Sequence, residues 1–547
     1  MSSGWRDIWR WSVLPPALLL ALPVLVIFAS VLQNQTEVWL HLRQTVLADY
    51  VINSLLLATG TGFGALLLGT STAWFVSQYQ FFFRRPLEWL LLLPLAMPAY
   101  IIAYTYTGML DFAGPVQSML RDQFGWRYGD YWFPQIQSLT GAIIMLSLVL
   151  YPYVYMLART AFAEQSASLF EASRTLGKSP RQHFWQVALP LARPAILTGT
   201  ALAMMEAFAD YGTVQYFGIA TFTTGIFRTW FGMGNQAAAA QLAAMLTSFV
   251  LVLLLLERWS RRKIRYYYQG QRSNVTPRRP LKAAKHAAVL LWCLMPVLLG
   301  FIIPIMQLGY WASERFAVTF DAQFASLVWN SFRLAAMAAA ISVLLALLFA
   351  YAKRLRRDTL VQLPVKVASL GYAVPGTVIA IGVMWPLAQL DSRIDLLAEQ
   401  WFGVRTGLIF SGTLFALLLA YTVRFLAVSL HSVESGLERI KPSMDNAARS
   451  LGYTPLQVLK RVHVPLLRGS VLTALLLVFV DVLKELPATL VLRPFNFNTL
   501  AVRTYELASD ERLADAALPA LAIVLVSLLP VILLARSATM KKDSGHA

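Results

Sequence analysis

The chain has 547 residues, of which 57% are hydrophobic and 14% are charged, and its 46 Lys and Arg against 28 Asp and Glu give a net charge of +18. Soluble domains carry about 45–50% apolar and about 25% charged residues, so this composition excludes a water-soluble enzyme and a disordered or collagen-like chain. The single cysteine, Cys293, excludes an internal disulfide framework and a multi-cysteine metal cluster.

Apolar segments of membrane-spanning length run along the whole chain. A helix that crosses about 30 Å of hydrocarbon needs about 20 mostly apolar residues. The first six segments that meet this requirement are residues 13–32, 52–76, 89–110, 139–157, 195–217 and 237–256. Six more are residues 287–308, 332–352, 368–387, 408–430, 470–492 and 516–535. The sequence therefore predicts an all-α polytopic membrane protein with about twelve spans.

Basic residues orient these spans. If the N-terminus is cytoplasmic, the inner segments hold about three times as many Lys and Arg as the outer ones, in the sense of the positive-inside rule. Both termini are then predicted to be cytoplasmic. The densest basic cluster, within residues 258–285, is interpreted as a linker that lies against anionic headgroups. A nucleic-acid site there is not favoured.

The two halves of the chain repeat each other. Residues 171–180 (EASRTLGKSP) align with residues 446–455 (NAARSLGYTP) at an offset of 275, and Pro98 aligns with Pro375 at an offset of 277. Six predicted spans separate each position from its counterpart, and an even number of crossings preserves orientation. The pattern predicts a tandem parallel 6+6 repeat rather than an inverted one.

The repeated cytoplasmic motif has readable local geometry. Ser168 and Glu171 have the spacing of a capping box, which starts a short helix, and Gly177 suits the left-handed residue that ends it. Ser179-Pro180 starts a second helix, which Pro190 is expected to interrupt at the membrane. The second half repeats these signals at Ser443, Gly452, Thr454-Pro455 and Pro465. We call residues 168–190 the first elbow and residues 443–465 the second elbow.

The elbows resemble the coupling loop of permeases of type I binding-protein-dependent ABC importers. The motif is E-A-A, then Gly, then nine residues, then I-x-L-P; here it reads Glu171-Ala-Ser, Gly177 and Val187-Ala-Leu-Pro190, and the second copy carries Asn446 in place of Glu. In that family the loop sits in a groove of an ATP-hydrolysing subunit. The resemblance implies ATPase contacts for Glu171, Ala172, Arg174, Gly177, Pro190, Asn446, Ala447, Arg449, Gly452 and Pro465.

Several of these positions have a simpler interpretation. Glu171 could only cap its own helix, and Arg174 and Arg449 could either pair with ATPase carboxylates or form a solvated face. Small side chains permit close approach of helices, so Ala172, Ala447 and Ala448 are the favoured docking residues.

No enzymatic centre is predicted in this chain. A phosphate-binding loop needs Gly-x-x-x-x-Gly-Lys-Ser/Thr, but residue 172, five before Gly177, is alanine. ATP and Mg²⁺ would therefore be bound by partner ATPase subunits, expected in two copies. The six histidines have no metal-ligand spacing, and no metal site is firmly assigned.

Four carboxylates lie inside predicted spans five and eleven. Glu206 and Asp210, and at an offset of 275 Asp481 and Glu485, are each spaced i, i+4, which predicts one acidic face per helix. Charged groups at membrane depth are costly and usually face a bundle interior or a watery path. A translocation pathway for a cationic substrate is one interpretation. Interhelical hydrogen bonds, an ion pair with Lys484 or a shorter true span is the other.

Residues next to these carboxylates resemble the ferric-iron branch of the same permeases, in which both halves are fused. The matching segments are residues 210–218, 221–232, 484–489 and 493–498. The resemblance implies a bacterial inner-membrane protein that imports Fe(III) delivered by a periplasmic iron-binding protein. The outer loop 111–137 is either a docking surface for it or an aromatic interfacial belt. Another small substrate, such as thiamine, and a gradient-driven secondary transporter are the alternatives.

The expected domain organisation follows from the repeat. Residues 1–51 hold an N-terminal tail, the first span and an outer loop, and residues 52–257 form the first type-1 permease domain. Residues 258–286 are the basic linker, and residues 287–329 hold the seventh span with an outer loop. Residues 330–536 form the second permease domain, and residues 537–547 are a cytoplasmic tail.

Overall fold

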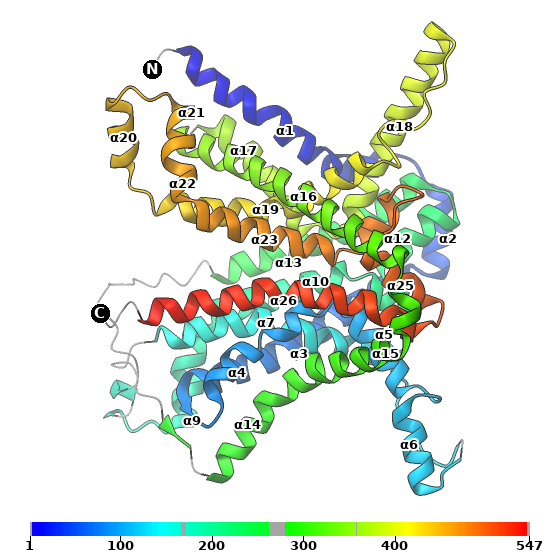
Figure 1. Cartoon of the computed structure of the whole chain (residues 1–547), viewed down its shortest axis with the longest axis vertical. Helices are drawn as coiled ribbons and strands as arrows, with labels where there is room; N and C mark the ends of the chain where they lie inside the picture. Colours follow the sequence, from blue (N-terminus) through cyan, green and yellow to red (C-terminus); the bar gives the residue numbers. More distant parts are fainter. Residues whose placement is uncertain are drawn as a thin grey trace. The chain divides into compact units, whose positions relative to one another are not determined.

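The computed structural model describes residues 3–127, 129–165, 171–173, 175–261, 279–281, 283–356 and 358–543. Helices dominate this part of the chain (Figure 1), which confirms the prediction of an all-α protein. The exception is a parallel pairing of two residues each, β1 (Tyr79–Gln80) with β2 (Arg279–Pro280).

By its contacts the chain divides into two units. Residues 1–41, 225–247 and 320–503 form unit 1, and residues 42–224, 248–319 and 504–547 form unit 2. Four helices pass from one unit into the other along the chain: α2 (Thr36–Thr45), α12 (Phe222–Phe227), α13 (Gln236–Arg261) and α25 (Leu500–Ser509).

Unit 2 is built around three helices that pack on one another in pairs, α3 (Leu47–Gln78), α7 (Leu139–Ala163) and α10 (Leu189–Ala209). Tyr151 and Tyr155 of α7 are fully buried, and their hydroxyls donate to the carbonyls of Leu91 (2.8 Å) and Glu88 (3.1 Å). The other elements of unit 2 are α4 (Arg84–Leu90), η2 (Leu93–Ala96), α5 (Ala99–Leu110), α6 (Pro115–Phe124), α9 (Pro180–His183), η3 (Phe184–Ala188), α11 (Gly212–Tyr216), α14 (Ala283–Val297), η5 (Leu298–Ile302), α15 (Ile303–Thr319) and α26 (Leu513–Asp543).

Unit 1 repeats this plan with α16 (Ala322–Leu355), α19 (Leu414–Glu438) and α23 (Arg468–Leu483). The first helix of the chain, α1 (Ser3–Ala29), packs in this unit against α17 (Thr359–Ala368) and α18 (Gly376–Phe402). A Cβ at Gly382 would lie 2.5 Å from the carbonyl oxygen of Pro23, so glycine permits this close crossing. The remaining elements are η1 (Ser30–Leu32), η4 (Arg228–Gly232), η6 (Ser369–Ala373), α20 (Pro442–Ser450), α21 (Pro455–Val458), η7 (Leu459–His463), α22 (Val464–Leu466) and α24 (Pro487–Leu492).

Nine helices of the described chain are long and apolar enough to cross a membrane, and the number rises to twelve if each of three bent helix pairs counts as one span. Two of the bends follow from proline. Met97 and Val374 precede Pro98 and Pro375 and have extended backbones, because the proline ring disfavours the helical region for the residue before it. The pairs bend there by 90° and 120°.

Candidate functional site

The first elbow turns as its sequence predicts. Gly177 has φ +73°, and the Lys178 N–H donates to the Ser173 carbonyl at 3.0 Å, which closes the end of the preceding helical turn. Ser179 and Gln182 then form a reciprocal capping box at the start of the next helix. Ser168 and Arg174 lie outside the described residues.

The second elbow has the same geometry in unit 1. Gly452 has φ +82°, the Tyr453 N–H donates to the Ala448 carbonyl at 3.1 Å, and Thr454 and Gln457 form the capping box. The equivalent hydrogen bonds lie 275 residues apart, so the repeat extends to single backbone contacts.

The predicted contact residues of the elbows divide into exposed and buried positions. Glu171, Ala172, Pro190, Asn446, Ala447, Arg449 and Pro465 are exposed. Ala448 is only 6% exposed, so little of its surface is accessible to a partner. It lies one helical turn after Asp445, on the buried face of α20. Leu176 and Leu451, which precede the two glycines, are each 76% exposed.

The second helix of each elbow contains a wide π turn at an equivalent position, η3 and η7. In η3 the Leu189 N–H donates to the Phe184 carbonyl, five residues back, and in η7 Val464 donates to Leu459. The prediction that Pro190 interrupts its helix is wrong, because the helix runs unbroken from Pro180 to Ala209. The π turn widens the backbone just before the proline ring, which avoids the clash that a regular helix would have. In the second half the helix bends by 77° at residue 467, two residues after Pro465.

Histidines that sequence reasoning left unassigned hold both elbows in place. Ser173 Oγ and His183 Nδ1 are hydrogen-bonded at 2.9 Å within the first elbow, and His463 Nε2 lies 2.6 Å from Asp445 in the second. Arg354 of α16 also binds Asp445, at 2.8 Å. No spacing motif connects these residues in the sequence; only the fold brings them together.

The predicted acidic helix faces are not formed. The helix α10 ends at Ala209 and α23 ends at Leu483, so Asp210 and Glu485 lie beyond the helices that carry Glu206 and Asp481. The helix α23 ends at Leu483 because Pro487 has no N–H to donate to the Leu483 carbonyl. Both helices therefore end before the predicted spans do.

Both displaced carboxylates cap the short helix that follows them. Asp210 accepts hydrogen bonds from the Val214 N–H (3.1 Å) and the Thr213 hydroxyl (3.0 Å) at the start of α11. Glu485 accepts hydrogen bonds from the N–H groups of Ala488 and Thr489, both at 3.1 Å, at the start of α24. A carboxylate at a helix N-terminus satisfies unpaired N–H groups and complements the helix dipole.

The carboxylates of unit 1 are also paired with basic side chains. Glu485, with 2% of its side chain exposed, lies 2.8 Å from Arg424 of α19. A Cβ at Gly376, the first residue of α18, would collide with both partners. Asp481 pairs with Lys484 at 2.9 Å, in the ion pair that the sequence left as an alternative. In unit 2, Glu206 is half-buried in the last turn of α10. Among the described residues, no group of three His, Cys, Asp or Glu side chains is placed to hold a metal ion.

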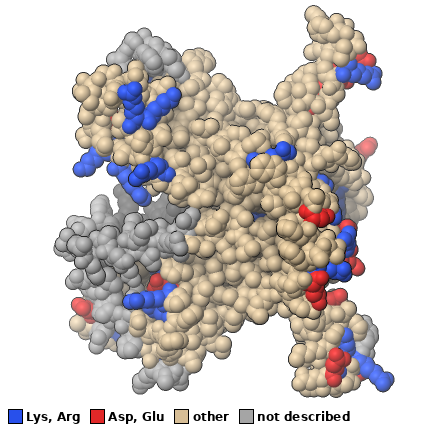
Figure 2. Space-filling model, viewed as in Figure 1, with Lys and Arg blue, Asp and Glu red and all other residues tan. Residues whose placement is uncertain are grey.

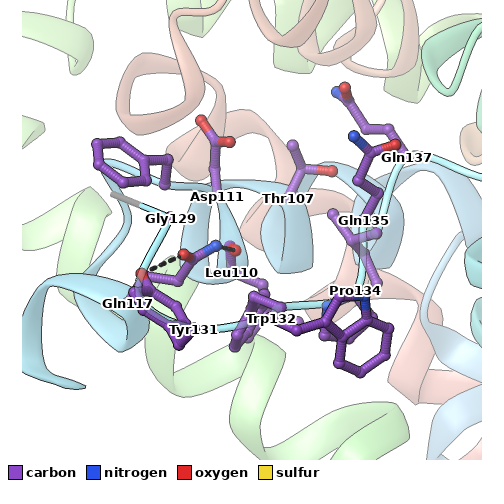
Figure 3. Close-up of a pocket in the computed structure, with 13 residues that line it drawn as sticks. Thr107, Leu110, Asp111, Gln117, Gly129, Tyr131, Trp132, Pro134, Gln135 and Gln137 are labelled. Carbon is purple, nitrogen blue, oxygen red and sulfur yellow. Dashed lines mark hydrogen bonds between the residues drawn. The ribbon is translucent and has the colours of Figure 1, made fainter. Parts of the chain in front are cut away.

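The outer loop 111–137 of unit 2 lines an open cavity of about 530 Å³ together with the end of α5. Its labelled lining residues come from the end of α5, from α6 and from the extended segment 129–137 (Figure 3). The Tyr131 hydroxyl donates to Gln117 at 2.7 Å and thereby ties this segment to α6. Trp132 is 85% exposed beside the cavity. The loop thus combines a polar hollow with exposed aromatic rings.

A corresponding arm in unit 1 was not found from the sequence. The helix α6 ends at Phe124-Gly125 and α18 ends at Phe402-Gly403, with φ +69° and +66° at the two glycines. Asp391 and Asp395 of α18 accept backbone hydrogen bonds from the returning segment, from Ser411 (2.7 Å) and Thr406 (2.7 Å). The exposed apolar side chains of this arm include Leu397, Trp401 and Phe402 at the end of α18.

Comparison with known proteins adds an independent line of evidence. The sequence model of a family described as "binding-protein-dependent transport system inner membrane component" matches the chain twice, over residues 65–266 and 342–540. The Fe(3+)-transport system permease protein FbpB 2 of Haemophilus influenzae is 28% identical over 95% of this chain and 97% of its own length. The ferric transport system permease protein FbpB of Actinobacillus pleuropneumoniae is 24% identical over 82% of this chain and 65% of its own length. The molybdenum transport system permease protein ModB of Escherichia coli is 24% identical over 40% of this chain and 92% of its own length.

Proposed function

The chain belongs to the family of binding-protein-dependent transport system inner membrane components, two copies of which are fused in it, and on that premise we propose that it forms the translocation pathway of an ATP-driven importer of ferric iron. The observation that carries the proposal is the long match to a ferric permease, which covers nearly all of both chains. The segments next to Asp210 and Glu485 support it, since they carry the resemblance to the ferric branch.

The energy would come from partner subunits. Two elbows with the same exposed leucine before a left-handed glycine fit two copies of a cytoplasmic ABC ATPase, and those subunits would bind ATP and Mg²⁺. We assign the ATPase-facing role to Glu171, Ala172, Gly177, Pro190, Asn446, Ala447, Arg449, Gly452 and Pro465. Arg174 belongs to the same proposal by its place in the sequence. ATP binding would move the elbows, and the packed helices would carry that movement to the membrane-spanning core.

The orientation follows from charge. Figure 2 shows Lys and Arg side chains gathered at the end of unit 1 that carries α20, α21 and α22. Basic residues favour the cytoplasmic side of the inner membrane, so we place both elbows and both termini there. The outer arms then face the periplasm, where an iron-binding protein would deliver its cargo.

Within the pathway, the four carboxylates have different environments. We propose that Glu206 and Asp210 provide oxygen ligands to the passing cation, because ferric iron is a hard cation that prefers such ligands. Asp481 and Glu485 are held by Lys484 and Arg424 in the described structure, so their contact with iron would require these pairs to open.

Reconstitution of the complete transporter tests the proposal. The chain, its ATPase and its iron-loaded binding protein are placed in vesicles without an ion gradient, and iron uptake is measured with and without ATP. We expect uptake only with ATP. Uptake that requires an ion gradient and ignores ATP would favour a secondary transporter instead.

A substrate test uses the same vesicles. The variants Glu206→Gln and Asp210→Asn should slow iron uptake, whereas Glu438→Gln, an exposed carboxylate at the end of α19, is the control for loss of charge alone. Equal uptake by all three variants would contradict the assigned pathway.

A further inference from the structure

Charged side chains tie the second elbow to the cytoplasmic end of α16. Arg354 Nε donates to Asp445 Oδ2 at 2.8 Å, and its other nitrogens donate to the carbonyls of Leu437 (2.5 Å) and Ile440 (2.8 Å). His463 Nε2 lies 2.6 Å from the second carboxylate oxygen of Asp445. The exposed fractions of the Arg354, Asp445 and His463 side chains are 16%, 14% and 0%. We call these three residues the ionic clamp.

Aromatic rings cover the ionic clamp and extend it to other elements. The Tyr351 ring lies edge-on to His463 at 5.2 Å, and its hydroxyl donates to the Pro455 carbonyl at 2.7 Å. Trp9 of α1 packs edge-on against Tyr351, also at 5.2 Å. The ionic clamp and the aromatic rings next to it therefore connect α1, α16, α20 and the second helix of the second elbow.

The first half has no counterpart of the ionic clamp. At the positions equivalent to Arg354, Asp445 and His463 the sequence has Ser77, Phe170 and Ala188, so every charged or titratable member is replaced. In the described part of the first elbow, Ser173 and His183 are hydrogen-bonded at 2.9 Å. Trp74, the counterpart of Tyr351, packs on Phe184 at 4.7 Å and on Phe162 at 5.2 Å.

We propose, on the basis of the function proposed above, that Arg354, Asp445 and His463 are positioning residues that transmit movement of α20 to the membrane-spanning helix α16. In the second half this connection is ionic. A partly buried ion pair with fixed hydrogen bonds holds one orientation of two helices.

The test measures coupling rather than activity alone. In the complete reconstituted transporter, both the ATP hydrolysed and the iron taken up are recorded, and their ratio is compared among variants. We expect Asp445→Asn to keep ATP hydrolysis but to lower iron uptake per ATP by at least about threefold, because Arg354 and His463 lose their shared partner. Asp445→Glu should restore part of the ratio. The control is Glu438→Gln, an exposed carboxylate at the end of α19, which should leave the ratio unchanged.

A double variant guards against misfolding. Arg354→Gln with Asp445→Asn leaves no lone buried charge, so it should fold at least as well as the single variant, and its iron-to-ATP ratio should stay low because the ionic clamp is still absent. A wild-type ratio in either variant, with unchanged elution and melting temperature, would overturn the ionic clamp. If the wild-type chain itself shows no ATP-driven uptake, the proposed function fails instead.

Discussion

Gly177 and Gly452 have a backbone conformation that favours glycine. Both have left-handed φ angles, and no atom lies within 4 Å of where a Cβ would be. Gly177→Val or Gly452→Val should therefore cost about 1–2 kcal/mol through backbone strain and not through collision. We expect lower iron uptake per ATP in each variant, measured in reconstituted vesicles.

Asparagine provides the matched control for these glycines. Gly177→Asn and Gly452→Asn add a side chain of similar size, but asparagine tolerates the left-handed region far better than valine does. If asparagine and valine impair coupling equally, the elbow turn is not the cause.

The ion pairs of Glu485 and Asp481 differ in burial, and burial decides how much each pair contributes to the stability of the fold. Removing the charge of Glu485 leaves Arg424 without its partner in a nearly closed site, so Glu485→Gln should destabilise the chain by about 3–5 kcal/mol. Asp481 and Lys484 are each about one quarter exposed, and Asp481→Asn should cost at most about 1 kcal/mol. Thermal unfolding in detergent compares the two, and equal losses would contradict the assigned ion pair.

At the residue scale, local sequence signals were sufficient to predict the turns of the elbows. Pairs of residues that are distant in the sequence but close in the fold could not be predicted. The capping residues Ser179 and Thr454 and the glycines 177 and 452 act within a few residues of chain, and their prediction is confirmed. The partner of Glu485 lies 61 residues away on another helix, and no periodicity indicates it.

Among the elements, the three-helix core of unit 2 depends on close approach to α7. A Cβ on Gly69 of α3 would lie 2.6 Å from Val154 Cβ, and one on Gly199 of α10 would lie 2.6 Å from Val154 Cα. Glycines on two helices thus press against the same residue of α7. Gly69→Leu or Gly199→Leu should lower the stability by about 1–3 kcal/mol or more, because the helices must move apart.

The control for this prediction is Gly469→Leu in α23. Nothing lies within 4 Å of a Cβ there, and its φ is not left-handed. Thermal unfolding of the three variants is the measurement. A melting temperature for Gly69→Leu equal to that of Gly469→Leu would contradict the packing described for unit 2.

The second elbow should also respond to acid in a defined direction. Burial alone would raise the pKa of Asp445, but hydrogen bonds from Arg354 and His463 outweigh it and hold this pKa below the usual value. Tyr351 and Arg449 are the other titratable groups close to the same cluster. A lowered pKa means that the carboxylate stabilises the fold at neutral pH and that this contribution is lost as the pH falls through the folded-state pKa.

The melting temperatures of the wild type and of Asp445→Asn measure this contribution. Their difference should stay constant from neutral pH to about pH 5 and shrink below about pH 4, the usual range of an aspartate. A difference that grows on acidification would contradict the assigned hydrogen bonds.

Element boundaries were predicted poorly where the count of apolar residues was used. The predicted spans 89–110 and 368–387 run through Pro98 and Pro375, where the structure bends by 90° and 120°. The criterion of 20 apolar residues extended the predicted spans five and eleven past Ala209 and Leu483, where the helices end. Hydropathy gives no signal for a helix end that lies inside an apolar segment.

For the whole molecule, the repeat predicted the architecture but not the assignment of helices to units. The cores α3–α7–α10 and α16–α19–α23 follow the predicted tandem repeat. The contacts of α1 are with α17 and α18 of the second half, over 300 residues away in sequence. An apolar helix carries no local signal of its partner, so only the fold reveals this exchange.

The account as a whole requires that both elbows lie in the cytoplasm and meet an ATPase. Leu176 and Leu451 are each 76% exposed, and the natural Cys293 is fully buried. Single cysteines at these leucines can therefore be labelled selectively with a membrane-impermeant maleimide, and Trp132→Cys in the outer loop serves as the control for the opposite side.

Labelling of Leu176→Cys and Leu451→Cys in sealed vesicles of known orientation, with and without the bound ATPase, is the most direct measurement. The account predicts that both cysteines react only from the cytoplasmic side and that the ATPase protects both, while Trp132→Cys reacts only from outside. Reaction of either elbow cysteine from the periplasmic side, or full reactivity beneath a bound ATPase, would contradict it.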